Sequence, residues 1–389
     1  MKTMKWKFYS LAFVAGMSIL TACSSDDNND NDGNGGNGNG NEIENGTILK
    51  GTITSDVTLA AGNTYKLSGE YIVEEGATLH IEEGVKIIAV YDDIADYILV
   101  KQGGKINAVG TPDKPIVMTS EKEEPGAWGG IHICGRAHTN AEGGKGSSEI
   151  GGAVYGGNDD ADNSGTLQYI RLEYTGFAFD EEHEANGISF YGVGNGTIVD
   201  HCQAYKGSDD GFEFFGGSVN VSNLVAVSCS DDSFDWTEGW NGKGTNLVAY
   251  QEAESTLGYD CDCLMECDNN GSTPVAHPVL KNLILVGNGG SKQGIRLRAG
   301  TEVEIDNAKV CGKGQPLTVE TALTENALKN GTSKLTNITL TSELSSKEGI
   351  YTHADFIAVT SNKVDANLSY SSFEDIRKEC SWMNGSWVK

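Results

Sequence analysis

The sequence predicts an all-β solenoid, a right-handed parallel β-helix with inserted loops and a C-terminal cap. Short stretches such as Ile131-His132-Ile133 alternate apolar and polar side chains, which is typical of β-strands. Glycine, with 51 residues, punctuates these stretches. The five residues from Asn223 return from Asn246 and, more loosely, from Asn282. A repeat of about 22 residues is the size of one β-helix coil, whereas an antiparallel sandwich would explain the alternation but not the spacing.

The first 22 residues are predicted to be a signal peptide. Three lysines precede a short apolar run over residues 11–20 that is too brief to span a bilayer. The run ends in Leu20-Thr21-Ala22-Cys23, which resembles the bacterial lipobox, in which the cysteine becomes the lipidated first residue of the mature protein. The alternative is an ordinary signal peptide followed by a chance cysteine. We therefore expect Cys23 to anchor the protein in the outer membrane.

Residues 23–46 are predicted to be a disordered, acidic, Gly/Asn-rich tether. Ile43 is its only large apolar residue, and such a segment cannot offset its ordering entropy. Acids directly after the lipidated cysteine resemble the surface-export signal of Bacteroidetes lipoproteins, which would place the domain on the cell exterior. A tether that faces the periplasm is the alternative. The formal net charge of −27 argues against nucleic acid as a partner, because phosphates would be repelled.

Residues 47–389 are expected to form the β-helix domain. Residues 69–90 and 103–120 each fit a strand, a tight turn and a second strand. From about residue 317 the repeat weakens, and we expect the last coils and a cap with short helices over residues 320–330 and 372–380. Trp382 and Trp387 are expected to cover the open hydrophobic end of the solenoid.

Two Asp-Asp pairs mark the clearest repeat. Residues 207–217 read GSDDGFEFFGG, and residues 229–239 read CSDDSFDWTEG. Neighbouring coils stack about 4.8 Å apart, so the two motifs should lie directly over one another. The aromatic side chains expected to stack inside the coils are Phe212, Phe214, Phe234 and Trp236.

The residues between these aromatics should face outward, because side chains alternate across a strand. Two carboxylates stacked at this spacing repel by about 0.9 kcal/mol in water and about 3.5 kcal/mol at an effective dielectric of 20. A bound cation such as Ca²⁺, a shared proton, an arginine partner or plain solvation would offset this repulsion. The expected outward column contains, in order, Ser189, Glu213, Asp235, Glu266 and Arg296.

Four more acids stand at the corner before these strands. They are candidates for a Ca²⁺ site because carboxylates are the ligands that this ion prefers. The alternative is local turn bonding, for which Asp is favoured. The four acids are Asp209, Asp210, Asp231 and Asp232.

Several long motifs carry a resemblance to a known family. The stretches AWGGIHICGRA, YGGNDDADNSGTLQYIRLEYTGFAF and GIRLRAGT, together with the Asp-Asp repeat, resemble lipoproteins or secreted proteins of Bacteroidetes and marine bacteria that contain a β-helix of the pectin-lyase type. The resemblance covers roughly residues 47–312, with a weaker echo in the closing CSWMNGSWVK. It implies a fold and a location, and it transfers no catalytic residues because the family has no settled activity.

Three functions remain open on this evidence. The first is a non-catalytic surface module that binds glycan or a partner protein through the acidic face or the region of Trp236 and Trp240. The second is a polysaccharide lyase or glycoside hydrolase, since a hydrolase needs two carboxylates in opposed roles and a lyase needs a base and usually a cation. The third is a structural spacer. Candidate catalytic residues are Glu213, Asp235, Glu266 and Arg296.

The cysteines and histidines predict no metal centre. Cys261, Cys263 and Cys267 could serve a zinc site, but a disulfide network is the expectation for an exported protein. Histidines such as His132 and His201 lack metal-ligand spacing and are expected at the surface or in turns.

Overall fold

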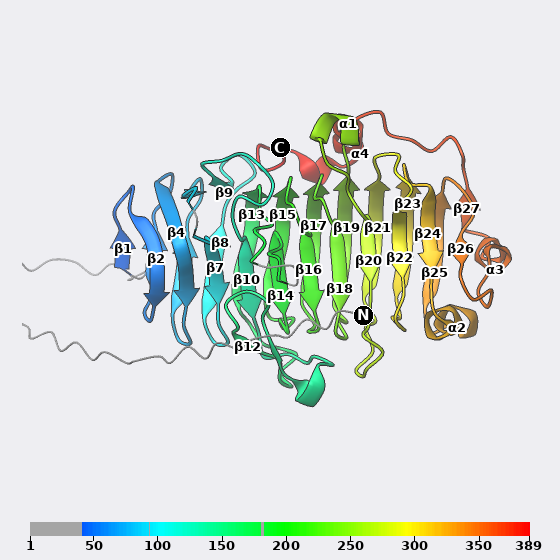
Figure 1. Cartoon of the computed structure of the whole chain (residues 1–389), viewed down its shortest axis with the longest axis horizontal. Coiled ribbons are helices and arrows are strands. Elements are labelled where there is room, and N and C mark those ends of the chain that lie inside the picture. The colour runs from blue at the N-terminus through cyan, green and yellow to red at the C-terminus, as the bar shows by residue number, and fades with distance from the viewer. Residues whose placement is uncertain (1–40, 93, 180–182) are drawn as a thin grey trace, which may run out of the picture. The chain divides into compact units, whose positions relative to one another are not determined.

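The computed structural model describes residues 41–92, 94–179 and 183–389. The predicted signal peptide, Cys23 and most of the predicted tether lie outside these residues. Twenty-five of the described strands form one continuous sheet, and all their pairings are parallel (Figure 1). The predicted parallel β-helix is therefore confirmed. In the part of the chain that the structure describes, no helix is long and apolar enough to cross a membrane.

The strands stack into three faces, and the first face carries the predicted outward column. It begins with the second halves of β2 (Ile48–Ile53) and β4 (Thr64–Val73). It continues through β7 (Tyr97–Val100), β10 (Ile131–Cys134), β14 (Ile188–Tyr191), β16 (Phe212–Phe215), β18 (Phe234–Thr237), β20 (Met265–Cys267), β22 (Gln293–Leu297), β24 (Gln315–Val319) and β26 (Ser345–Ser346).

In the first coils, the second and third faces are built from separate strands. The second face contains β1 (Asn41–Ile43), β3 (Val57–Leu59), β5 (Thr78–Ile81) and β8 (Lys105–Val109). The third face contains the first halves of β2 and β4, followed by β6 (Lys86–Ala89) and β9 (Ile116–Ser120). Because β1 pairs with β3, residues 41–43 belong to the sheet, and the tether boundary expected at residue 46 is wrong.

Later coils use long strands that serve both faces. Each bends at a residue with a left-handed backbone, such as Asn223 (φ 55°) and Asn246 (φ 59°), conformations that asparagine tolerates. The Nδ2 of Asn246 donates to the Oδ1 of Asn223 at 2.8 Å, which links neighbouring coils. The recurring asparagine in the sequence therefore marks this corner. The long strands are β13 (Gly165–Glu173), β15 (Ile198–Tyr205), β17 (Asn220–Val227), β19 (Lys243–Tyr250), β21 (Val279–Val286), β23 (Glu304–Cys311) and β25 (Lys334–Leu340), and β27 (Lys363–Val364) ends the series.

The interior holds the predicted aromatic stack. The rings of Phe212 and Phe234 lie 5.6 Å apart and nearly parallel, and both side chains are buried in the main core. Trp236 is also buried, as predicted, although the ring of Phe214 stacks on Trp240 at 4.1 Å rather than on Trp236. Because Trp236 and Trp240 are both in the core, the expectation that they form a contact surface is wrong.

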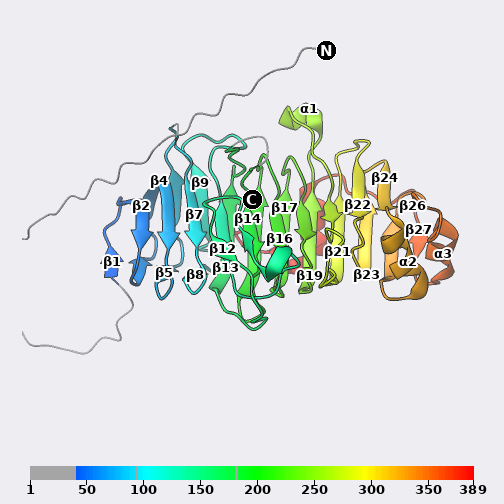
Figure 2. The same ribbon diagram turned by 60° about the horizontal axis from the view of Figure 1, so that its bottom comes forward.

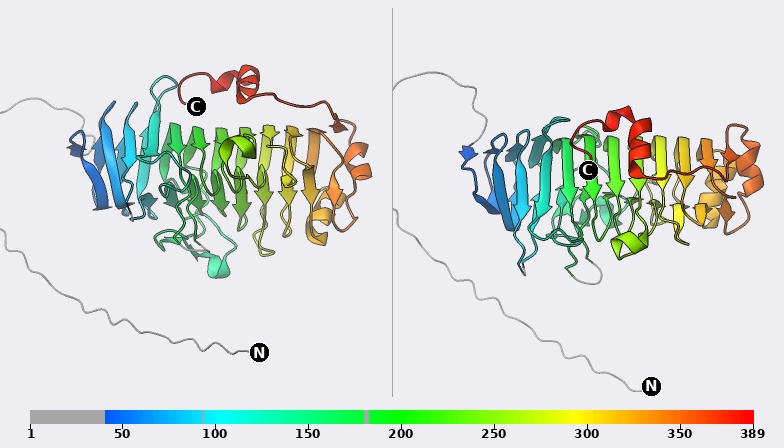
Figure 3. Two further views of the ribbon diagram at one scale, coloured as in Figure 1. Left: turned by 45° about the horizontal axis from the view of Figure 1, so that its top comes forward. Right: turned by 90° about the horizontal axis from the view of Figure 1, so that it is seen from above.

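The helices predicted over residues 320–330 and 372–380 are both present, as α2 (Ala322–Asn330) and α4 (Phe373–Glu379), and the structure adds a helix that was not predicted, α3 (His353–Ala358). Helices α2 and α3 lie at the last coils, where they cap the solenoid (Figure 1). Helix α4 and the 3-10 helix η2 (Ser381–Met383) lie on a segment that runs back along the solenoid (Figure 3).

The two C-terminal tryptophans lie on this returning segment, so their predicted role as an end cap is wrong. Trp387 is fully buried and packs against the third face, 6.1 Å from the ring of Tyr169. Arg171 Nη1 donates to the carbonyl oxygen of Ser386 at 2.7 Å. The segment covers outward apolar side chains of the third face, including Val225 and Val248, which explains why it turns back.

The cysteines do not form the expected disulfide network. All eight that follow Cys23 are free and buried. Cys202, Cys229 and Cys267 pack as small apolar side chains in the main core. Burial raises the pKa of the Cys229 thiol to about 12. These cysteines act as core residues.

Insertions between the coils surround part of the first face. Residues 135–164 carry the 3-10 helix η1 (Glu142–Gly144) and the hairpin of β11 (Gly146–Ser147) and β12 (Val154–Tyr155), and this insertion projects from the solenoid (Figures 1 and 2). Residues 251–264 carry the short helix α1 (Glu254–Leu257), which lies at the opposite ends of the strands (Figure 1). The outward column therefore runs between two sets of loops.

Candidate acidic site

The outward column has the register that the sequence predicts. Ser189 pairs with Glu213, and Glu213 pairs with Asp235. The series continues through Glu266 to Arg296. Strand pairing every coil thus places five polar side chains in one line along the first face.

The C-terminal end of this column is a closed ion-pair network. Arg296 lies 3.2 Å from a carboxylate oxygen of Glu266 and 3.3 Å from one of Glu320. Arg298 lies 2.7 Å from Glu266 and 2.6 Å from Asp268. Burial acts to lower the pKa of Arg296, but the hydrogen bonds to Glu320 and the charge of Glu266 raise it above its usual value. Arg296 is therefore a structural cation here and poorly suited to act as a base.

The middle of the column gathers three carboxyl groups. Asp210, Glu213 and Asp235 each place a carboxylate oxygen within 4.8 Å of the other two. Burial, followed by the charge of Asp235, raises the pKa of Glu213 well above its usual range. Burial, followed by the charge of Glu266, does the same to the pKa of Asp235, although the charge of Arg298 acts to lower it. A proton or a cation is needed to relieve this repulsion.

Asn186 completes this group of three acids. Its side chain is fully buried, and its Nδ2 donates to Glu213 Oε2 at 2.6 Å and to Ser189 Oγ at 3.0 Å. The Oδ1 of Asn186 and the Oδ1 of Asp235 are buried and have no hydrogen-bond partner. Ca²⁺ takes oxygen ligands at about 2.3–2.6 Å, and three clustered carboxylate oxygens are ligands of the type that this ion prefers.

The two aspartates of each Asp-Asp pair make different contacts. The second Asp of each pair links coils, because Asp210 Oδ1 accepts the Asp232 amide at 2.8 Å and Asp232 Oδ1 accepts the Cys263 amide at 2.6 Å. These bonds join neighbouring coils, so they differ from the local turn bonding that was the alternative for these two aspartates. The four aspartates do not form one ligand set: Asp209 and Asp231 group with Asp210, whereas Asp232 groups with Asp262 and Cys263.

The N-terminal end of the column is covered, and an aromatic column of Tyr191 and Phe215 runs beside it. His132 precedes Ser189 in the register and is fully buried, so its predicted surface position is wrong. Burial lowers the pKa of His132 to about 4. The rings of Tyr191 and Phe215 stack at 4.4 Å, and the hairpin residues Ile150 and Tyr155 pack over them.

The insertion contributes one acid that the sequence analysis missed, Glu149, and its hairpin contacts a second, Glu238, which follows β18. Tyr155 Oη donates to Glu238 Oε2 at 2.8 Å, which fixes the hairpin beside β18. Burial of its carboxyl group raises the pKa of Glu149 to about 7, although the residue keeps exposed surface, and the charge of His183 acts to lower it. Burial, followed by the charge of Asp231, also raises the pKa of Asp209 to about 7.

Two of the missed residues had a sequence signal. Aligning Ala185-Asn186-Gly187 with Asp209-Asp210-Gly211 places Asn186 in the aspartate corner, and the same alignment extends to Asp262. Glu149 and Tyr155 had none, because they come from an insertion outside the repeat.

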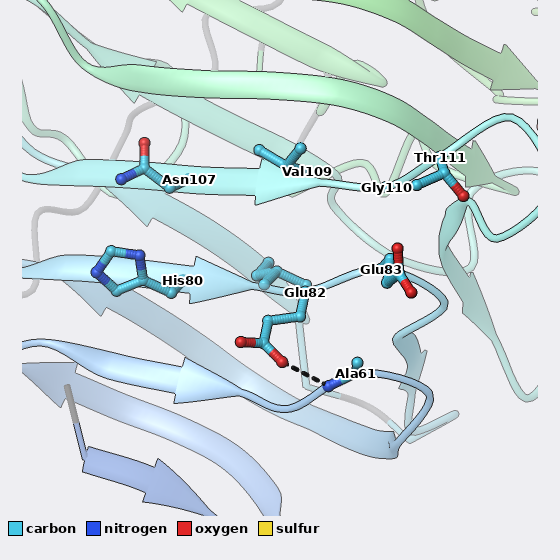
Figure 4. A pocket seen from close by; sticks show the side chains of 9 residues that line it. Ala61, His80, Glu82, Glu83, Asn107, Val109, Gly110 and Thr111 are labelled. Atoms are coloured by element: carbon cyan, nitrogen blue, oxygen red, sulfur yellow. Dashed lines mark hydrogen bonds between the residues drawn. The ribbon is translucent and has the colours of Figure 1, made fainter. Parts of the chain in front are cut away.

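A separate cavity of about 490 Å³ lies on the second face, near His80 and Asn107 (Figure 4). Its acids already have partners: Glu82 accepts the Ala61 amide at 2.9 Å, and Glu83 pairs with Lys114 at 2.8 Å. No predicted site residue lines it, so the acidic group on the first face remains the candidate site.

The comparisons with known proteins agree with this architecture. Residues 51–388 match the family model of the pectate-lyase-like β-helix domain. Neither the curated proteins nor the solved structures gave a match. The matched range spans nearly all the coils and the returning C-terminal segment, and the chain therefore belongs to the family of pectate-lyase-like β-helix domains.

Proposed function

We propose that this chain is the glycan-binding module of a cell-surface lipoprotein and that it binds through its acidic face, the outer side of β16, β18 and β20. The observation that carries the proposal is the group of Asp210, Glu213 and Asp235 within 4.8 Å. Buried like charges cost stability, so a pure spacer has no use for them. The pectate-lyase-like family is consistent with a carbohydrate ligand.

Glycoside hydrolysis is the second candidate, and one observation favours it. Glu213 and Asp235 bring carboxylate oxygens within 4.8 Å, close to the separation of about 5–5.5 Å between the carboxyl groups of retaining glycosidases. Their raised pKa values would allow one of them to carry a proton at neutral pH. A lyase is less well supported, because Arg296 is held in ion pairs.

We also propose that Ca²⁺ binds at the acidic group. Asp210, Glu213 and Asp235 would be its carboxylate ligands. Three of the four predicted corner aspartates, Asp209, Asp210 and Asp231, form a second such group. The ion would offset the repulsion between these carboxylates.

A glycan-array and polysaccharide-degradation screen on the full-length protein, with and without Ca²⁺, tests these proposals. Binding without cleavage supports the module. Cleavage that Glu213→Gln or Asp235→Asn removes, while binding persists, supports the hydrolase. Glu343→Gln, an exposed acid in the last coils, is the matched control. If no glycan is bound or cut, the glycan proposal is wrong, and a protein partner or a spacer remains.

The location is proposed from Cys23 and the acidic residues that follow it. We propose that a lipid on Cys23 holds the domain at the outer membrane, facing the exterior. Cys23→Ala should abolish membrane association, and protease added to intact cells should release the domain. Protection until the cells are lysed would contradict the outward orientation and leave lipidation standing.

A further inference from the structure

The acidic face needs a proton or an added positive charge to relieve its repulsion, because Arg298, whose charge acts on Asp235, is already held in the ion-pair network. At 4.8 Å, two carboxylates repel by about 3.5 kcal/mol at an effective dielectric of 20. Asp235 Oδ1 has no hydrogen-bond partner. Asn186, which is 0% exposed and bonded to Glu213, also leaves its Oδ1 without one. These buried acceptors point to a missing donor or cation at this position.

The described cations beside this group are already occupied. Lys292 pairs with Asp262 at 2.7 Å, at the corner before β22. Arg296 and Arg298 are held by the acids of the ion-pair network at distances of 2.6–3.3 Å. A ligand carboxylate placed on this face would therefore meet negative charge and would have to break an existing ion pair.

The surroundings extend this negative field. Asp209 and Glu149 flank the group, and the charge of each acts to raise the pKa of Glu213. The charge of Glu184 also acts on Asp209. A sugar with a positively charged substituent matches this negative field, because its ammonium group can donate to carboxylates.

We infer that the acidic face selects saccharides that carry protonated amino groups and rejects polyuronates. The inference rests on the proposed glycan-binding function and specifies its ligand class. The ammonium group of an amino sugar would bind at the carboxylate oxygens of Asp210, Glu213 and Asp235. The ligand of this member would then differ in charge from pectate, the anionic polymer after which the family is named.

Three oligosaccharides of equal length test this inference on the full-length protein at pH 6 in EDTA: a β-1,4-glucosamine hexamer, its N-acetylated form and a hexagalacturonate. Isothermal titration calorimetry should show the amine form binding at least tenfold more tightly than the N-acetylated form, and no binding of the galacturonate. Glu213→Gln and Asp235→Asn should each weaken amine binding about tenfold, or about 1.4 kcal/mol.

The net charge of −27 attracts any polycation, so a control for nonspecific binding is essential. Glu304→Gln removes an equal charge from the second face and should leave the affinity unchanged. Ca²⁺ should weaken amine binding by competing for the same carboxylates. Unchanged affinity with Ca²⁺, or an equal loss in Glu304→Gln, would overturn the assignment.

The remaining outcomes separate this inference from the proposed function. Galacturonate binding as tight as amine binding, in EDTA or in Ca²⁺, would overturn the charge selection while supporting a glycan module. Equal binding of the amine and N-acetylated forms would have the same meaning. Failure of all three sugars here and of every glycan on the array would instead contradict the proposed function.

Discussion

The two sides of β16 and β18 show how one repeat creates two different environments. On the inner side, the rings of Phe212 and Phe234 stack on each other and are buried in the main core, so no ligand or ion is required to stabilise them. On the outer side, Glu213 and Asp235 stack at the same spacing and leave acceptors unpartnered. Stacking stabilises apolar rings and destabilises like charges. The inner side therefore explains the stability of the solenoid, and the outer side is the place to seek its function.

The largest expected effect is on the inner side. Phe234→Ala should lower the free energy of unfolding by about 3–5 kcal/mol, because it removes a buried ring from a stack and leaves a cavity. Chemical denaturation monitored by circular dichroism would measure this. Val109→Ala, at a position 42% exposed on the second face, should cost far less. A loss below about 1 kcal/mol for Phe234→Ala would show that the inner stack is not a packed core.

The next largest expected effect is stabilisation of the outer side by Ca²⁺, whose positive charge would offset the repulsion between the acids. If Ca²⁺ binds Asp210, Glu213 and Asp235, it should raise the free energy of unfolding by about 2.7 kcal/mol at a hundredfold excess over Kd. Thermal unfolding with a Ca²⁺ titration would measure the shift. Asp235→Asn should abolish it, whereas Glu343→Gln should keep it. If Ca²⁺ does not change the thermal stability of the wild-type protein, the proposal that Ca²⁺ binds at the acidic group is wrong.

The packing of the inner side could be predicted from the sequence. On the outer side only the order of the acids could be predicted, and not their surroundings. Alternation and the repeat were enough to place Phe212 over Phe234 and Glu213 over Asp235, because strand pairing fixes both at once. The surroundings of those acids come from the insertion that carries Glu149 and Tyr155, which has no periodicity to align. The position of Trp387 was missed for a related reason: the strands show an outward apolar stripe, but not which segment covers it.

A smaller effect separates protonation from ion binding on the outer side. In EDTA, the folded acids keep protons that the unfolded chain releases above about pH 4. Their stabilising contribution is therefore full below pH 4 and is lost as pH rises through the folded pKa, about 7 for Asp209 and Glu149. Stability should fall between pH 5 and pH 8. Burial and the charge of Glu266 also raise the pKa of Asp235, so Asp235→Asn should remove the share of this fall that Asp235 contributes and raise stability at pH 8 by roughly 1–3 kcal/mol.

Thermal unfolding of wild type and Asp235→Asn across that pH range is the measurement, with Glu343→Gln as the control. A wild-type curve that rises with pH would show that the acids are stabilised in their charged form. The acidic face would then already be balanced by groups of its own chain, and neither an ion nor a cationic ligand would be required there.

The smallest effect tests whether the insertion, rather than the coils, makes the outer side different. Tyr155→Phe removes the hydrogen bond to Glu238 at 2.8 Å and should cost about 1 kcal/mol of stability, because the ring stays packed beside Tyr191. Tyr91→Phe, at an exposed position on another loop, should change stability by less than about 0.5 kcal/mol. Loosening the hairpin should also admit water to Glu149, so that the pKa of this carboxyl falls from about 7 toward its ordinary value. NMR titration of the Glu149 carboxyl carbon would measure that shift, and an unchanged pKa in Tyr155→Phe would show that the coils, and not the insertion, set the environment of the acidic face.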